Sequence, residues 1–416
     1  MRILMVNWFY PPEYSGAGLQ CHRLSLQLQA RGIEVDILAG TLRADLVGPG
    51  KVDGLGIFRV WCDKSNPYKH LLYGGRLVSQ ILASISRYDL LHTHGFILPA
   101  SLAARLKRRP LVQKITNLNI DDPMAVERRR FGGMLMSFYR RADVLIPTSG
   151  RLEMCCRLAL SAAKRIVQIP NGVDTALFTP ASAAERSRLR NKFGIAAQDT
   201  VLLTLGPVNY KKGIDVLIRA LNLLPQSVRL WVIGPLDHSR GGRDDGASCY
   251  NSICRELHQL GLSRRVRFFG YQAKVHEFLR AADIYVHPSR GEGQPNSILE
   301  AMASGLPTVA NLLPGITDEI IQNGKFGYLI EDNQPDVLAA ALRILINNPA
   351  LRKRLGWTAR EDIVRNYSLV SVADRYYDLY RELLRPDHSA AAPRGTEGRD
   401  CKGWFRKELH FNRGER

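Results

Sequence analysis

Short apolar runs alternate with amphipathic stretches along almost the whole chain, and this alternation restricts the folds that it can adopt. In the first 180 residues, strand-like runs lie at 3–9, 33–40, 56–62, 88–95, 110–116 and 142–149. Sequence with helical spacing separates them, for example over 17–32 and 70–87. An alternation of strands and helices predicts a parallel, doubly wound sheet with helices on both of its faces.

The pattern breaks at residues 169–180, where IPNGVDTALFTP combines an Asn-Gly turn with two prolines. Beyond this break the alternation starts again, with strand-like runs at 200–206, 228–235, 266–271, 282–289 and 306–311. A chain of 416 residues is long enough for two separate hydrophobic cores. We therefore predict two parallel-sheet domains, 1–181 and 182–367, with the boundary near Pro180 to Ala183.

The sequence after the second domain divides into a long amphipathic helix, about 368–385, and a polar tail, 386–416. The tail contains glycine and is rich in charge, a composition typical of disordered segments. Within it, Trp404 and Phe405 stand beside Arg406 and Lys407, a combination that also suits contact with a membrane.

Residues 289–311, SRGEGQPNSILEAMASGLPTVAN, have the pattern of a tight turn, a helix and a short strand. Glu292 lies in the turn between Gly291 and Gly293, where backbone without side chains can approach a ligand closely. A second acid, Glu300, follows in the helix. Carboxylates accept hydrogen bonds from hydroxyl-rich groups, so the two acids suit a sugar or a ribose.

The helix of this segment begins near Pro295, a residue that suits a first helical turn because it has no N–H to satisfy. Asn296 and Ser297 then lie at the helix N-terminus, where free N–H groups bind phosphate oxygens. Together with the two acids, this helix start predicts a site for a nucleotide diphosphate joined to a sugar. An alternative stays open, in which Ser297 and Glu300 form a capping box that only closes their own helix.

The chain is strongly basic, with 58 Lys and Arg against 39 Asp and Glu and a net charge of +19. Residues 1–180 hold 24 of these basic residues and 13 of the acids, and such a bias favours an anionic partner. The stretch 126–143, VERRRFGGMLMSFYRRAD, predicts a basic helix with a stripe of Met134, Leu135, Phe138 and Tyr139. This pattern suits a helix on anionic lipid headgroups, and equally a helix whose stripe faces the core.

His92 and His94 share one side of the strand end at 88–95, because positions two apart in a strand face the same way. No third ligand accompanies them at a zinc-binding spacing, so we predict no metal site. We expect the pair to line a cleft, with His94 the better candidate for contact with an acceptor molecule.

The segment 289–311 resembles the E-x7-E motif of the retaining nucleotide-sugar glycosyltransferases of family 4, also called group 1 glycosyltransferases. Gly16 and Gly18 resemble the N-terminal glycine loop of that family. A dinucleotide fingerprint fits less well, because Cys21 stands at the place of its third glycine. Residues 169–180 match the family's linker, and 205–220, LGPVNYKKGIDVLIRA, match its diphosphate-binding segment with Lys212 at the position of the family's lysine. The resemblance covers nearly the whole chain.

This resemblance implies the GT-B architecture, in which two facing Rossmann-like domains enclose a cleft and the C-terminal helix packs back on the first domain. It implies that Glu292 faces the donor sugar, and with His94 on the acceptor side these two are our catalytic candidates. The expected donor-binding residues are Gly16, Gly18, Lys211, Lys212, Gly293, Asn296, Ser297 and Glu300, with Glu300 on the ribose hydroxyls. We expect no metal and no cofactor, only a nucleotide diphosphate sugar as co-substrate.

The chain departs from the family pattern at two places. Pro207 stands where the family often has an arginine for the diphosphate, a role that Lys211 can fill in part. Thr116 or Asn117 stands where the family's active-site histidine often lies. Asp121 and Asp122 follow closely, and they either replace this polar group or cap the next helix.

We therefore predict a hexosyltransferase that moves a sugar from a nucleotide diphosphate donor to an acceptor hydroxyl with retention, in the synthesis of cell-surface polysaccharide, lipopolysaccharide or other glycolipid. Its expected partners are the donor, a glycan or lipid-linked acceptor and an anionic membrane surface, and we expect no nucleic acid. The chain shows no apolar run of membrane-span length and no signal peptide, and its seven cysteines have no ligand or disulfide spacing, so we expect a cytoplasmic protein that is peripheral on the inner face of the membrane. Two alternatives stay open: a nucleotide-sugar epimerase or phosphorylase on the same fold, and a non-catalytic basic binding protein.

Overall fold

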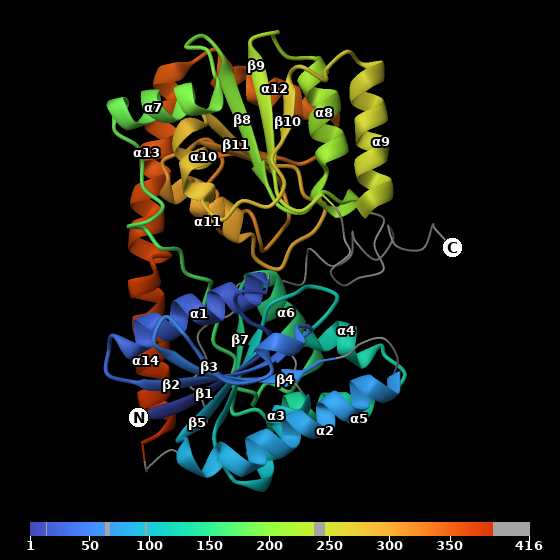
Figure 1. Cartoon of the computed structure of the whole chain (residues 1–416), viewed down its shortest axis with the longest axis vertical. Coiled ribbons are helices and arrows are strands. Elements are labelled where there is room, and N and C mark those ends of the chain that lie inside the picture. Colours follow the sequence, from blue (N-terminus) through green and yellow to red (C-terminus); the bar gives the residue numbers. More distant parts are fainter. Residues whose placement is uncertain (14, 63–66, 96–97, 237–245, 386–416) are drawn as a thin grey trace.

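The computed structural model describes residues 1–385 except 14, 63–66, 96–97 and 237–245. Two α/β domains are stacked along the long axis of the molecule, and the last two helices run along one side of both (Figure 1). The two sheets confirm the predicted fold class. The tail 386–416, with Trp404 and Phe405, lies outside the described residues.

The first domain is built on a seven-stranded sheet with the order β3-β4-β2-β1-β5-β6-β7. Its strands are β1 Arg2–Phe9, β2 Glu34–Thr41, β3 Gly48–Val52, β4 Leu55–Trp61, β5 Leu90–His94, β6 Leu111–Ile115 and β7 Val144–Pro147. Its helices are α1 Gly16–Gln29, α2 Pro67–Ser84, α3 Leu98–Leu106, α4 Pro123–Glu127, α5 Gly132–Arg141 and α6 Gly150–Ala159. The strand order reverses between β1 and β5, and such a switch point opens a crevice at the carboxyl ends of the strands.

One edge of this sheet differs from the expected all-parallel pattern, because β3 pairs antiparallel with β4. Asp53 and Gly54 form the two-residue turn between them, with φ angles of 48° and 82°. Two consecutive positive φ angles are typical of a type I′ hairpin turn, for which Asp-Gly is a preferred sequence. The hairpin therefore follows from a local signal that the strand–helix alternation does not take into account.

The second domain has a six-stranded parallel sheet with the order β10-β9-β8-β11-β12-β13. Its strands are β8 Thr200–Leu205, β9 Val228–Ile233, β10 Val266–Phe268, β11 Ile284–His287, β12 Thr308–Asn311 and β13 Gly327–Ile330, of which β13 is an addition to the predicted set. The helices are α7 Ala183–Phe193, α8 Ile214–Asn222, α9 Gly246–Gln259, α10 Val275–Ala281, α11 Asn296–Ala303, α12 Pro335–Ile346 and α13 Pro349–Asn366. Here the order reverses between β8 and β11, so the second crevice lies at their carboxyl ends.

The single basic helix predicted over 126–143 is wrong in its continuity, since α4 ends at Glu127 and α5 begins at Gly132. Gly132 lies so close to the preceding turn that a Cβ there would be 1.8 Å from the Glu127 carbonyl oxygen. The predicted stripe is divided as well, because Tyr139 is fully buried while Met134 is 57% exposed. The interpretation of the stripe as core-facing thus applies to Tyr139, and the interpretation as surface-facing applies to Met134.

The last helix, α14 Leu369–Leu383, follows the second domain in sequence but packs on the first. Its Val372, Tyr376 and Tyr380 are buried in the same apolar cluster as Ile3 and Met5 of β1. A fully buried large apolar side chain contributes roughly 1.5–3 kcal/mol, so α14 is an integral part of the first core. Among the described residues, no helix combines the length and the apolarity that a bilayer span requires.

Candidate active site

Two turns meet at the carboxyl edge of the second sheet, one after β8 and one after β11. The backbone N–H of Arg290 and the hydroxyl of Ser289 both donate to the Lys211 carbonyl oxygen, at 2.8 and 3.1 Å. Gly213, with φ of 66°, packs so tightly on the other turn that a Cβ would be 2.0 Å from the Pro288 carbonyl oxygen. Only glycine fits this position, and the contact holds the basic turn against the acidic one.

Glu292 and Lys212 form an ion pair where these turns meet. The Lys212 Nζ atom donates to Glu292 Oε1 at 2.6 Å, and the two side chains are only 20% and 11% exposed. His287 Nε2 lies 3.2 Å from the same oxygen, close enough for an electrostatic contact although not aligned as a hydrogen bond. Burial alone would raise the pKa of Glu292, but Lys212 and His287 outweigh burial and hold that pKa well below its usual range. Glu292 is therefore a buried, permanently ionised acceptor.

Helix α11 begins directly after the acidic turn and is tied to the linker between the domains. Pro295 is the residue before its first turn, so Asn296 and Ser297 are the first two helical residues. Asn171 donates from its side chain to Asn296 Oδ1 at 2.8 Å and from its backbone to Gln294 Oε1 at 2.6 Å. No side chain caps α11, and Ser297 lies inside the helix, so the capping-box alternative is wrong. The backbone N–H groups of the first turn of α11 have no side-chain cap, so the positive end of the helix is available for an anion.

Glu300, one turn further along α11, pairs with a residue of the other domain. Arg23 of α1 donates from Nη1 to Glu300 Oε1 at 3.0 Å, and the two side chains are 13% and 11% exposed. The Arg23 guanidinium also lies over the Phe178 ring, 5.5 Å from its centre. Burial raises the pKa of Glu300 and Arg23 offsets part of this rise. The expected ribose-binding acid thus also joins the two domains.

Gly293 forms a second contact between the domains, at the place where the sequence departs from the family pattern. A Cβ on Gly293 would lie 2.0 Å from the Thr116 carbonyl oxygen and 3.3 Å from Asn117 Cα. The loop that carries Thr116 is fixed by Asp121, whose carboxylate accepts from the Thr116 hydroxyl at 2.8 Å and from the Asn117 N–H at 2.5 Å. Thr116 therefore lies against the acidic turn through its backbone.

The two aspartates after Thr116 have separate roles. Asp122 caps α4 by accepting from the Ala125 N–H at 2.9 Å, as one of the two interpretations predicted. Asp121 is buried, and burial raises its pKa to about 6. Its hydrogen bonds to the Thr116 loop make it a structural group of that loop.

The glycine loop after β1 leads into α1 and belongs to the carboxyl edge of the first sheet. Ser15 caps α1 by accepting from the Gly18 N–H at 3.1 Å. Gly18 packs on the strand end, since a Cβ there would be 2.4 Å from the Phe9 carbonyl oxygen, whereas a Cβ on Gly16 would meet nothing within 4 Å. Gly16 therefore leaves open backbone at this loop.

His94, expected to line the acceptor side of the cleft, is instead 1% exposed. Its ring stacks on that of His92, 4.6 Å away, and His92 Nδ1 lies 2.6 Å from the Tyr380 hydroxyl. Helix α14 covers this side of β5, and burial lowers the pKa of both histidines well below its usual value. Sequence reasoning also missed Lys114, the register neighbour of His94 on β6, which is 2% exposed and whose pKa burial lowers to about 8. A lone lysine within the apolar run 110–116 was the available signal.

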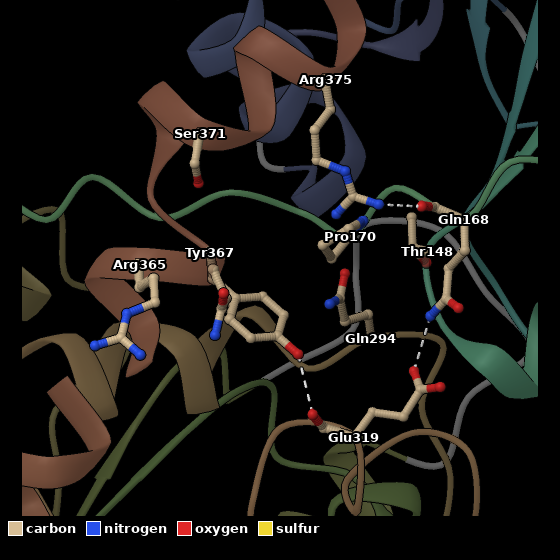
Figure 2. Close-up of a pocket in the computed structure, with 10 residues that line it drawn as sticks. Thr148, Gln168, Pro170, Gln294, Glu319, Arg365, Tyr367, Ser371 and Arg375 are labelled. Carbon is tan, nitrogen blue, oxygen red and sulfur yellow. Dashed lines mark hydrogen bonds between the residues drawn. The ribbon is translucent and has the colours of Figure 1, made fainter. Parts of the chain in front are cut away.

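A cavity of about 660 Å³ lies where the linker, the second domain and the α13–α14 junction meet (Figure 2). Glu319 is central to it, accepting from the Gln168 side chain at 2.9 Å while its carbonyl oxygen accepts from the Tyr367 hydroxyl at 3.0 Å. The Glu319 carboxylate also accepts from the Gly150 N–H, at 2.8 Å, and so caps α6 of the first domain. These contacts place the cavity at the junction of the two domains, a region that the sequence motifs do not indicate.

The described residues contain no group of three or more His, Cys, Asp or Glu side chains arranged to hold a metal ion.

Comparison with known proteins gives matches over both domains. The family model described as "Glycosyltransferase Family 4" matches residues 14–177, and the one described as "Glycosyl transferases group 1" matches residues 185–362. A protein of Methanocaldococcus jannaschii described as an uncharacterized glycosyltransferase is 26% identical over 403 residues, covering 92% of this chain and 98% of the relative. A D-inositol 3-phosphate glycosyltransferase of Xylanimonas cellulosilytica is 29% identical over 404 residues, covering 90% of this chain and 93% of the relative.

Solved structures share the architecture. Sucrose-phosphate synthase of Thermosynechococcus elongatus superposes with a TM-score of 0.79 at 22% identity, over 92% of this chain and 98% of its own. HepE of Anabaena, crystallised with UDP and glucose, superposes with a TM-score of 0.76 at 21% identity, over 92% of this chain and all of its own. At this level of identity the likeness concerns the fold, and it confirms the GT-B architecture predicted from the sequence.

Proposed function

Because this chain belongs to the group 1 glycosyltransferases of family 4, we propose that it transfers a sugar from a nucleotide diphosphate donor to an acceptor hydroxyl with retention of configuration. The observation that carries this proposal is the buried Glu292–Lys212 pair beside the free N-terminus of α11. A fixed carboxylate, an ammonium and helix N–H groups are the three kinds of group that a sugar diphosphate requires.

The diphosphate binds to positive groups of the second domain. Lys212 and the backbone of Asn296 and Ser297 face it, with Lys211 as a second cation on the same turn. Pro207 occupies the place where the family often has an arginine for the diphosphate. Arg290 does not take over this role, because its guanidinium is bound to Asp215 at 2.7 and 2.9 Å. The leaving group therefore depends on Lys212 and the helix N-terminus, and these preformed charges stabilise it as the bond to the sugar breaks.

Donor binding exchanges the partners of the Lys212–Glu292 ion pair. Lys212 neutralises Glu292 in this pair, which avoids an unpaired buried charge. The diphosphate then takes the Lys212 ammonium, and Glu292 accepts hydrogen bonds from the sugar hydroxyls. The acceptor oxygen bonds to the anomeric carbon on the face that the diphosphate leaves, and the hydroxyl proton passes to a departing phosphate oxygen. No residue acts as a covalent nucleophile in this scheme.

Glu300 binds the ribose hydroxyls through the carboxylate oxygen that Arg23 leaves free. Arg23 occupies Oε1 only, and a carboxylate offers a second acceptor oxygen. In this arrangement Arg23 acts through Glu300 as a positioning residue. We do not extend the catalytic assignment to His94, since its burial prevents contact with an acceptor.

Several relatives support the choice of donor and acceptor. The similar structures include HepE of Anabaena with UDP and with UDP-glucose, so UDP-sugars are the first donors to test. WaaG, described as a glycosyltransferase of lipopolysaccharide biosynthesis, shares the fold with a TM-score of 0.69 at 19% identity. A glycan or lipid-linked acceptor, used on the cytoplasmic face of a membrane in glycolipid or polysaccharide synthesis, is consistent with these relatives. The comparisons do not favour the epimerase, phosphorylase or non-catalytic alternatives.

The test pairs a donor screen with two variants. Thermal shift against UDP-glucose, UDP-N-acetylglucosamine, UDP-galactose and GDP-mannose identifies the donor, because a bound ligand raises apparent stability. Transfer of radiolabelled sugar from that donor to extracted envelope lipids and glycans is then measured for wild type, Glu292→Gln and Lys212→Ala. We expect both variants to lose transfer while remaining folded, and Glu331→Gln, which changes an exposed acid of the same domain, to keep it. Wild-type rates in both site variants would refute the assignment.

A further inference from the structure

Helices α3 and α5 of the first domain pack side by side and each presents a stripe of apolar and basic side chains to the surface. On α3, Leu102 and Leu106 lie one turn apart and are 39% and 60% exposed, with Arg105 between them. On α5, Met134 and Arg141 are seven residues apart and so lie on the same face. Met134 is 57% exposed, and Phe131, just before α5, is 61% exposed. We call this surface the α3–α5 face.

The two stripes converge on a hollow of about 350 Å³ at the amino ends of β6 and β7. Arg105, Arg108, Arg109 and Arg141 line it together with a single acid, Asp143, whose carboxylate accepts from the Leu111 N–H at 2.7 Å. Within the part of the chain that the structure describes, Arg105, Arg108 and Arg141 form no ion pair. The hollow therefore carries an uncompensated positive charge at the surface.

The charge of the surrounding sequence has the same sign. Residues 101–141 contain 10 Lys and Arg against 3 Asp and Glu, and two of these acids, Asp121 and Asp122, are buried. An arginine-rich groove alone would also suit nucleic acid, whose phosphates bind basic side chains without any need for apolar ones. Exposed leucine, methionine and phenylalanine among the arginines instead match the boundary between lipid headgroups and acyl chains.

We propose that the α3–α5 face is a docking surface for an anionic lipid bilayer, with phosphate headgroups in the arginine hollow and Leu106, Met134 and Phe131 in the outer acyl region. Helices α3 and α5 lie in the lower part of the first domain as drawn, on the side away from the second domain (Figure 1). This docking does not depend on the transfer chemistry, and it gives a lipid-linked acceptor a direct route to the cleft.

The route follows from the direction of α5. A crossover helix runs back from the carboxyl edge of a parallel sheet to its amino edge, so α5 begins near the cleft and ends at the hollow. Its 10 residues span about 15 Å. The loop before α4, which carries the exposed Ile120 and the Thr116 contact with Gly293, lies at the cleft end of this path. A bilayer along α5 therefore reaches the rim of the active site.

Vesicle sedimentation tests the proposal with the full chain. Wild type should bind vesicles of equal parts phosphatidylglycerol and phosphatidylcholine, bind pure phosphatidylcholine far less, and bind the anionic vesicles more weakly as salt is raised. The triple variant Arg105→Gln, Arg108→Gln, Arg141→Gln should bind the anionic vesicles roughly a hundred-fold more weakly, at about five-fold for each arginine. Met134→Ser with Leu106→Ser should reduce the binding that persists at high salt.

A matched triple variant separates the face from net charge. Arg264→Gln, Lys353→Gln, Arg354→Gln removes the same charge from exposed positions of the second domain and should bind as wild type does. Equal losses in both triple variants, absent binding by wild type, or binding to duplex DNA in preference to vesicles would each overturn the proposal. Donor binding by thermal shift is measured on the same preparations, so that a failure of docking is distinguishable from a failure of the proposed transferase.

Discussion

A single methyl group placed on Gly293 should separate the two domains. The Cβ of an alanine would lie 2.0 Å from the Thr116 carbonyl oxygen, where ordinary contact begins at 3.4 Å. One side must therefore move by about 1.4 Å, since overlap of this size cannot be absorbed in place. The Thr116 loop cannot move freely, because Asp121 holds both its hydroxyl and the next N–H. The second domain is the part that gives way.

The expected consequence is a loss of activity out of proportion to any loss of stability. Each domain has its own core, so we expect the variant to unfold within about 1–2 kcal/mol of wild type. Transfer requires the donor turn and the first domain to meet, and a misplacement of about 1 Å costs roughly a hundred-fold in rate. The two domains should also lie further apart, which enlarges the radius of gyration.

Gly291→Ala is the matched control. It adds the same methyl group two residues away, where the nearest atom is Lys211 Cε at 3.6 Å, an ordinary contact. Sugar transfer, chemical denaturation and small-angle scattering are compared for wild type and both variants. If Gly293→Ala kept the wild-type transfer rate and radius of gyration, the inference that the Thr116–Gly293 contact sets the distance between the two domains would be wrong.

Three further predictions concern charged groups. Lys212→Ala should lower the free energy of unfolding of the second domain by about 3 kcal/mol in urea titrations, because it leaves Glu292 buried and unpaired. Lys212→Ala with Glu292→Gln should recover part of the lost stability, and a smaller loss in the single variant than in the double variant would contradict the argument. Arg23→Gln and Glu300→Gln should be non-additive by about 1 kcal/mol in a double-mutant cycle, and strict additivity would show that the pair does not couple the domains. Burial lowers the pKa of Lys114 from 10.5 to about 8, so the unfolded chain binds more protons between these values and stability should rise as pH increases through this window. Lys114→Met should remove that rise with pH and stabilise the protein at pH 7 by up to about 3 kcal/mol, measured by thermal unfolding at a series of pH values. If the variant kept the wild-type pH profile, the inference that Lys114 is buried in its charged form below this window would be wrong.

Local patterns predicted the architecture because they depend on residues close in sequence. Apolar spacing placed both sheets, and the turn-to-helix start at 289–297 placed α11 within a residue. The signal for the Asp53-Gly54 hairpin was equally local, but a prediction from strand–helix alternation does not consider antiparallel strand pairs. Gly132 likewise explains why one predicted helix became two, because only a residue without a Cβ lets α5 begin against the Glu127 carbonyl oxygen.

The contacts between the domains could not be predicted, because they join residues far apart in sequence. Arg23 and Glu300 are separated by 277 positions, and the sequence around either residue does not predict the other as its partner. The expectation for His94 failed for the same reason. The helix that covers it brings Tyr380 to His92 from 288 positions away. Motifs thus gathered the candidate ligand-binding residues of one turn, but tertiary packing decided which of the candidates are accessible.

The place of α14 has a consequence for synthesis of the protein. The face of the first sheet that bears Ile3 and Met5 is covered in part by Leu24 and Leu28 of α1, and Tyr376 and Tyr380 complete its cover only at the end of the chain. Domains usually fold as they leave the ribosome, starting from the N-terminus. Here the second domain, from α7 to α13 (residues 183–366), has all its strands before the first domain is complete. The nascent chain must therefore carry a partly open apolar surface through most of translation, and α14, the last helix of the described residues, is the one that closes it.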